Sequence, residues 1–370
     1  MTRSLPPVDV VVSGSGIAAA AIAVELARRD LSVELVSRGR PGAAAGPGGP
    51  VAAQARAAGP EPLADLALLS RHLFSDWVSA LEEETGLSCE YDERGALTVV
   101  FDEDGEMALD RALDAQRARG LHFEVLDAEE ARGREPALAA TLHAAFAFPR
   151  DGVARAGRVG TALVLAARAA GVRVREGAVA EAVSVSAGRV SGLRTSEGLV
   201  PAETVVLAGR RGPDGIAGAP RLRLGRKARA WRRLEAASDP DRPTRLIESA
   251  GAALVPRRDG SVLVLSGAPA GPAARRVPAA DAAGLLAAVA RLVPSSRDWS
   301  VAALGVARER SAPDGLPVLG EAEEGLLVAA GWGGEELLLA PAAAAVVADL
   351  VTGRVPPVAA TPFGPSRLGT

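Results

Sequence analysis

The sequence predicts an α/β fold whose first element is a βαβ unit of the dinucleotide-binding type. Residues 8–12 are an apolar, β-branched run, which indicates a buried parallel strand. Gly14 and Gly16 follow directly, an alanine-rich amphipathic run continues to residue 29, and residues 31–36 form a second strand. Strand, glycine turn, helix and strand in this order are typical of the G-x-G-x-x-G/A fingerprint.

Each small residue of this turn has a physical role in binding a dinucleotide. Gly14 permits the tight turn, and Gly16 removes the side chain that would block a pyrophosphate. Ala19 lets the helix and the strand pack closely. The free N–H groups and the dipole at the start of the helix then favour an anion. The turn therefore predicts a nucleotide cofactor.

The second strand lacks the acid that usually holds the adenosine ribose. That acid should lie ~20 residues beyond the turn, and Ser37 stands there, followed by Arg38. A serine hydroxyl can make one hydrogen bond to a ribose but not the charged, bidentate contact of a carboxylate. Arg38 leaves open a 2′-phosphate, as in NADP sites.

Composition excludes several classes of protein. The chain has 370 residues, enough for two domains or one large domain with an inserted lobe, and its net charge of −3 argues against a nucleic-acid-binding protein. Cys89 is the single cysteine, which excludes an intramolecular disulfide and a cysteine-based metal site, and the three histidines are too far apart to suggest metal ligands. The last apolar helix is shorter than the ~20 residues that a bilayer needs, so we expect a cytoplasmic protein with no membrane partner.

The remaining elements follow from hydrophobic periodicity. Helices are predicted at residues 63–84, 107–119, 159–169, 279–292 and 335–351. Strands are predicted at residues 97–101, 146–149, 172–175, 204–209, 252–256, 261–265 and 325–330, with a hairpin at 183–200 that turns near Gly188. Asp127 and Glu130 form a capping-box pattern.

Two segments allow more than one interpretation. Residues 40–50 are small residues and prolines with no hydrophobic period, so they are either a flexible linker or a loop whose backbone lies against a ligand. In residues 221–233, basic and apolar residues alternate, which predicts a half-exposed strand. Its basic face is either solvated or directed at an anion or a partner.

This order of motifs resembles the flavin-dependent amino-acid oxidase superfamily, which includes D-amino acid oxidase and sarcosine oxidase, and within it the glycine oxidases of thiamine synthesis. The resemblance spans nearly the whole chain and is carried by the N-terminal fingerprint and by residues 38–42, 81–86, 95–100, 149–152, 205–209, 254–257, 313–320 and 338–341. It implies a Rossmann-like FAD/NAD(P)-binding domain from residues 1–84, 146–211 and 300–370. It also implies an inserted α+β substrate domain with an antiparallel sheet, from residues 85–145 and 212–299.

The resemblance also implies a reaction on a small amine or amino-acid-like substrate. A hydride would move from the carbon next to the amine to flavin N5, oxygen would reoxidise the flavin, and the imine would hydrolyse. Arg308 or Arg310 would hold a substrate carboxylate, and Trp332 would be an aromatic residue of the pocket. No metal is implied, and the implied FAD-binding positions are Ser13, Gly14, Gly16, Ile17, Ser37, Arg38, Ala44, Ala45, Val179, Gly209, Gly331, Gly333, Gly334 and Glu335.

Several residues depart from the family pattern and indicate a degenerate active site. Ser37 replaces the ribose-binding glutamate, Ala253 replaces a tyrosine, and residues 332–336 lack the arginine of an Arg-Asn-Gly motif. Glu335 and Glu336 begin the last helix and either oppose negative charge on a reduced flavin or point to solvent.

These departures leave three hypotheses. The chain is an FAD-dependent amine or amino-acid oxidase; or it is a redox-inactive homologue, either the non-catalytic subunit of a heteromeric oxidase or a repurposed binding protein or enzyme; or it is an NADP-type reductase. We also expect a homo-oligomer or a hetero-oligomer with a related oxidase subunit.

Overall fold

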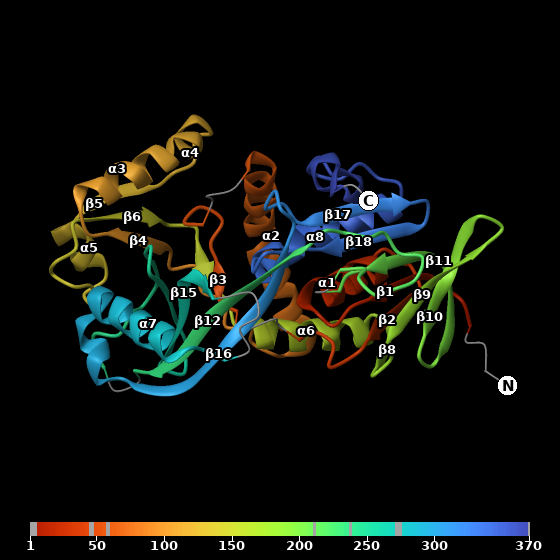
Figure 1. Cartoon of the computed structure of the whole chain (residues 1–370), viewed down its shortest axis with the longest axis horizontal. Helices are drawn as coiled ribbons and strands as arrows, with labels where there is room; N and C mark the ends of the chain where they lie inside the picture. The colour runs from red at the N-terminus through yellow and green to blue at the C-terminus, as the bar shows by residue number, and fades with distance from the viewer. Residues whose placement is uncertain are drawn as a thin grey trace.

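The computed structural model describes residues 6–43, 48–56, 60–209, 212–236, 239–270 and 276–368. The strands fall into two groups, one toward each end of the long axis of the molecule (Figure 1). No helix among the described residues is long and apolar enough to cross a membrane.

The first sheet contains the predicted βαβ unit at its centre. Its strands follow the order β17-β18-β11-β1-β2-β8. Strand β1 pairs in parallel with both β2 and β11, and α1 (Ile17–Ala27) connects β1 to β2. The bounds are β1 (Val8–Ser13), β2 (Val33–Ser37), β8 (Arg173–Glu176), β11 (Gly198–Leu207), β17 (Val318–Glu323) and β18 (Leu326–Ala330).

A hairpin extends the outer part of this sheet. Strands β9 (Ala180–Ser186) and β10 (Arg189–Thr195) are antiparallel, and β10 pairs onward with β11. Ala187 and Gly188 form the turn with φ angles of 51° and 78°. The turn that was predicted near Gly188 is therefore confirmed.

Three further helices form the main core together with α1. They are α2 (Glu61–Thr85), α6 (Ala156–Ala169) and α8 (Glu336–Val351). Residues 17–24 of α1 are almost completely buried, and five of them are alanines. Side chains of this size let neighbouring helices approach α1 closely, and both α6 and α8 contact it.

The second sheet follows the order β16-β12-β15-β14-β13-β4-β6-β5. Neighbouring strands are antiparallel except β13 and β4, which are parallel. Its strands are β4 (Ala96–Val100), β5 (Glu124–Asp127), β6 (Ala144–Phe148), β12 (Gly225–Glu235), β13 (Leu246–Glu248), β14 (Ala252–Pro256), β15 (Ser261–Ala270) and β16 (Ser300–Ser311). The predicted strand at 221–233 corresponds to β12.

Shorter elements surround this sheet. Helix α7 (Ala279–Leu292) packs against β14 and β15. The single helix predicted at 107–119 is divided at Leu113 into α3 (Glu103–Ala112) and α4 (Asp114–Ala118). Helix α5 (Ala128–Arg134) begins with the predicted capping box of Asp127 and Glu130. The 3₁₀ helices are η1 (Pro294–Asp298), η2 (Thr361–Phe363) and η3 (Pro365–Leu368).

Two strands lie in a different sheet from the one that the predicted domain ranges imply. Strand β16, which falls in the range 300–370 expected in the FAD-binding domain, pairs along its whole length with β12 of the second sheet. Most of β6 falls in the range 146–211, yet β6 also belongs to the second sheet. A small pair, β3 (Pro50–Val51) and β7 (Gly152–Val153), forms apart from both sheets. The division into domains stays a prediction.

Candidate functional site

The glycine turn after β1 is closely packed on one side. Gly14 donates a backbone hydrogen bond of 3.0 Å to the carbonyl of Val36. A Cβ atom on Gly14 would lie only 2.5 Å from the carbonyl oxygen of Ala208, at the end of β11. The turn therefore requires glycine at this position so that β1, β2 and β11 can end side by side.

A cavity of about 440 Å³ opens beyond this turn. Six of the predicted cofactor-binding residues line it: Ser13, Gly14, Gly16, Arg38, Val179 and Gly209. They come from the ends of β1, β2 and β11 and from the start of β9. Ligands of open parallel sheets bind beyond the carboxyl ends of the strands, which is where this cavity lies.

Ser37 lies at the end of β2 but does not face this cavity. Its side chain is fully buried. Its hydroxyl lies 2.8 Å from that of Ser15 and donates a 2.5 Å hydrogen bond to the carbonyl of Gly39. The Ser37 hydroxyl thus stabilises the local turn, and Arg38 is the neighbour that lines the cavity.

Glu336, the first residue of α8, contacts the start of α1 directly after the same glycine turn. The backbone N–H of Ala18 donates a 3.1 Å hydrogen bond to Oε1 of Glu336. The Glu336 side chain is buried and lines the 440 Å³ cavity. A carboxylate of the chain itself therefore satisfies a backbone donor at the start of α1.

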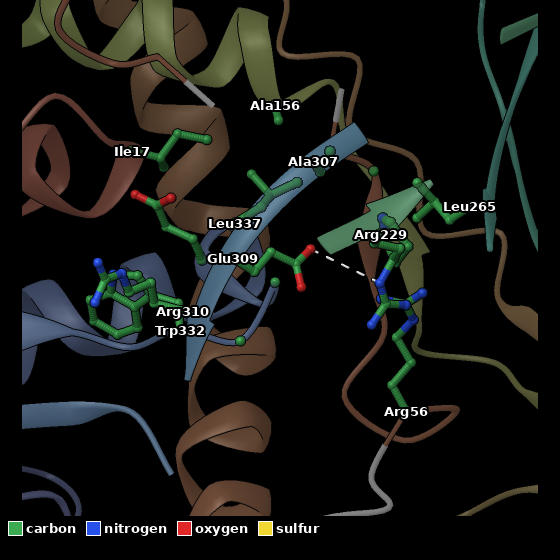
Figure 2. A pocket seen from close by; sticks show the side chains of 16 residues that line it. Ile17, Arg56, Ala156, Arg229, Leu265, Ala307, Glu309, Arg310, Trp332 and Leu337 are labelled. Atoms are coloured by element: carbon green, nitrogen blue, oxygen red, sulfur yellow. Dashed lines mark ion pairs between the residues drawn. The ribbon is translucent and has the colours of Figure 1, made fainter. Parts of the chain in front are cut away.

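A second, smaller cavity of about 80 Å³ lies on the other side of Glu336. Figure 2 shows its lining, with Glu309 and Arg229 directed toward each other and Arg310 beside Trp332. The predicted residues that line it are Ile17, Arg310, Trp332, Gly333 and Gly334. Gly331 begins the same turn with a φ of 74°, and Ala44 and Ala45 lie outside the described residues.

Of the two predicted arginines on β16, only Arg310 lines the cavity. Arg308 is exposed and is not part of the lining. Arg310 lines the cavity, but its guanidinium donates to Asp214 at 2.6 Å. The carboxylate of Glu309, between them, lies 4.0 Å from the guanidinium of Arg229. Catalytic roles for Arg308 and Arg310 stay predictions.

Arg56 is a cavity residue that sequence reasoning missed. It forms ion pairs with Glu248 at 2.6 Å and with Glu335 at 3.2 Å. Burial lowers the pKa of Arg56, but the charges of Glu248 and Glu335 outweigh it, and the pKa lies above its usual value. Arg56 is therefore a permanent cation at the cavity wall. Its partners are distant in sequence, so no local motif could have indicated it.

A buried polar network holds the backbone next to Arg56. The carboxylate of Asp151 accepts hydrogen bonds from the backbone N–H groups of Gln54 and Ala55, the latter at 2.7 Å. Arg71 donates to Asp151 at 3.0 Å and to the Gln54 side chain at 2.6 Å. The position of Arg56 thus depends on an acid in the turn after β6.

Trp332 lines the smaller cavity, and its indole carries an unsatisfied, buried donor. The residue is buried, and its indole N–H has no hydrogen-bond partner among the described residues. A buried donor without a partner is costly, so such a group is often one that meets a ligand.

Comparisons with known proteins find matches that cover nearly the whole chain. Residues 9–350 match the family model described as FAD dependent oxidoreductase. The chain is 33% identical to a glycine oxidase of Geobacillus kaustophilus (strain HTA426) over 97% of both chains. It is 29% identical to the bifunctional protein ThiO/ThiG of Synechocystis sp., covering 98% of this chain and 54% of that protein. The crystal structure of glycine oxidase from Geobacillus kaustophilus superposes with a TM-score of 0.90 at 30% identity, covering 98% of this chain and 99% of that one.

The described residues fit the nucleotide half of FAD. The cavity of about 440 Å³ lies at the glycine turn, where Gly16 has no side chain and α1 begins. Gly14, Gly16, Arg38, Val179 and Gly209 would hold this half. Together with the match over residues 9–350, these features lead to one conclusion: the chain belongs to the family of FAD-dependent oxidoreductases.

Proposed function

We propose that this protein oxidises a C–N bond of a small amine or amino-acid-like substrate with FAD, in the manner of a glycine oxidase. The observation that carries the proposal is the pair of cavities on the two sides of Glu336. One is suited to a nucleotide, and the other contains charged side chains, an indole and little else polar. The similarity to glycine oxidase over almost the full length supports it.

The chain's own residues would bind and orient the substrate. FAD, when bound, supplies the hydride acceptor. Trp332 lines the smaller cavity, and its indole N–H, which is buried and has no partner among the described residues, would donate to a bound group once a local side-chain movement exposes it. Arg56, Arg229 and Arg310 line this cavity and Arg308 does not, so a substrate carboxylate would meet one of the first three guanidinium groups. Glu309 and Glu336 are the acids of the cavity lining, and one of them would meet a substrate ammonium.

The cofactor would be held without the usual ribose acid. Ser37 is buried in its own turn, so we propose that Arg38 and the cavity backbone make the contacts at the ribose. This arrangement predicts weaker retention of FAD during purification than a carboxylate would give.

An absorbance spectrum tests the proposal most directly. The purified protein is measured as isolated and again after excess FAD has been added and unbound FAD removed. A flavin band near ~450 nm that is bleached by an amine, with release of hydrogen peroxide, is the expected result. Glycine, sarcosine and D-amino acids are the first substrates to test. A colourless protein that also fails to bind added FAD contradicts the proposal and favours the redox-inactive alternative.

A further inference from the structure

We propose that the Glu336 carboxylate occupies the place that the pyrophosphate of FAD needs, so that FAD can bind only when this side chain turns away. Glu336 would then set the affinity for FAD. The inference rests on the proposed function, because it concerns the cofactor of that reaction, and it adds a residue that controls how readily the cofactor is bound.

The position of the carboxylate is defined by two measurements. Oε1 of Glu336 accepts the backbone N–H of Ala18 at 3.1 Å. A Cβ atom placed on Gly16 would lie only 2.1 Å from the same oxygen. The carboxylate therefore lies directly against the open face of Gly16, over the first turn of α1.

That open face is where a dinucleotide phosphate approaches the backbone. Glycine at this position of the fingerprint leaves space for the pyrophosphate, and the first N–H groups and the dipole of the helix attract its charge. A carboxylate is also an anion and an acceptor of N–H groups. Glu336 and a pyrophosphate would thus compete for the same donors and the same space. Two negative charges a few ångströms apart also repel each other strongly in a buried site.

The position of Glu336 between the two cavities also places it in the path of the cofactor. Glu336 lines the cavity of about 440 Å³ and also the cavity of about 80 Å³. Among the lining residues of the two, Glu336 alone belongs to both. The pyrophosphate joins the adenosine half of FAD to its flavin half, so a cofactor that reached both cavities would have to pass the Glu336 side chain.

The neighbouring acid is held differently. Glu335 forms an ion pair with Arg56 at 3.2 Å, and a quarter of its side chain is exposed. The backbone of both residues is fixed at the start of α8. Rotation about side-chain bonds is therefore the movement available to Glu336, and it needs no change in the fold.

The experiment measures binding of three ligands to the full-length protein after any bound flavin has been removed. The ligands are FAD, ADP and adenosine, and binding is followed by isothermal titration calorimetry. The variants are Glu336→Ala and Glu336→Gln. Glu324→Gln is the matched control, because it removes one negative charge from an exposed pair with Arg189. Circular dichroism confirms that each variant is folded.

The expected result is specific to phosphate. Glu336→Ala should bind FAD and ADP at least tenfold more tightly than the wild-type protein. Adenosine, which has no phosphate, should bind equally to both. Glu336→Gln, which loses the charge but keeps an acceptor for Ala18, should bind FAD and ADP at least threefold more tightly. This variant decides the test if the alanine variant does not fold. Glu324→Gln should match the wild-type protein throughout.

Two results would overturn the inference. One is an unchanged or weaker affinity of the Glu336 variants for FAD and ADP, and the other is an equal gain for adenosine. If the wild-type protein binds FAD and oxidises amines while the variants bind no more tightly, the inference fails and the proposed function stands. If the variants gain FAD affinity and no amine is oxidised, the proposed function fails and the inference stands. If neither the wild-type protein nor a variant binds FAD, both are overturned.

Discussion

Gly42 and Gly160 approach each other so closely that neither position has room for a side chain. A Cβ atom on Gly160 would lie 1.8 Å from the carbonyl oxygen of Gly42, and one on Gly42 would lie 2.2 Å from that of Gly160. Gly42 follows β2 and precedes Ala43, which lines the larger cavity. Helix α6 is therefore in backbone contact with the loop that leads to the nucleotide site.

Replacing Gly160 should destabilise the protein, although alanine is the better helix former. The clash is with backbone, which can move only if the loop or α6 shifts, so Gly160→Ala should cost about 1–3 kcal/mol. Gly157→Ala in the same helix is the control, because no atom lies within 4 Å of its Cβ position. That variant should gain up to about 1 kcal/mol. Urea denaturation measures both, and equal effects would contradict the close contact as the cause.

Removing the charge of Asp151 should destabilise the fold strongly. In Asp151→Asn the buried guanidinium of Arg71 loses its ion pair, and the N–H groups of Gln54 and Ala55 face an amide in place of a carboxylate. Breaking one side of a buried pair costs about 3–5 kcal/mol. Glu176→Gln, which breaks the exposed pair with Arg168, should stay within about 0.5 kcal/mol of the wild-type protein. Chemical denaturation of both variants gives the comparison, and similar losses would show that burial is not the reason.

The thiol of Cys89 should be unreactive in the folded protein. Burial, with a smaller contribution from the charge of Glu82, raises the pKa of Cys89 to about 12. Since only the thiolate is the nucleophile, a thiol reagent at pH 8 should label no cysteine in the native protein. In guanidinium chloride the single cysteine of the chain should react completely. Rapid and complete labelling under native conditions would show that the site around Cys89 opens readily.

Trp332→Phe should separate substrate binding from stability. Phenylalanine keeps an aromatic ring in the smaller cavity but removes the indole N–H, which has no partner among the described residues. Loss of an unsatisfied donor should leave stability within about 0.5 kcal/mol. Loss of a hydrogen bond to substrate should raise KM by about tenfold, which corresponds to ~1.4 kcal/mol. Steady-state kinetics with the amine found in the substrate screen measures it, and an unchanged KM would place the indole away from the substrate.

The sequence predicts the parts of this fold that depend on neighbouring residues. The βαβ unit at residues 8–37, the turn at Gly188 and the capping box of Asp127 and Glu130 all form from segments that are short and local. Glycines, caps and apolar periodicity carry this information, because each acts over a few residues. These elements accordingly appear where they are expected.

The chemistry of the site depends on residues that are far apart along the chain. Glu336 meets Ala18 across 318 positions, and Arg56 meets Glu248 across 192. No local pattern contains such a contact, and Arg56 lies in a segment without any motif. Glu335 and Glu336, at the start of α8, are examples of residues whose partners the sequence does not indicate. They were expected to face either the flavin or solvent, yet Glu335 binds Arg56 and Glu336 turns to the glycine turn.

Strand β16 has a consequence for how a substrate reaches the smaller cavity. It pairs with β12 along its whole length at the edge of the second sheet (Figure 1). At its end Ser311 forms an isolated bridge with Trp332, in the turn between β18 and α8. The backbone N–H of Gly333 also donates to Arg310 at 2.9 Å. One unbroken strand thus joins the second sheet to the turn that follows β18, the strand of the first sheet that ends beside α8. We expect the two halves to move as a single body, so a substrate would enter through movement of loops and side chains, with no closure of one half upon the other.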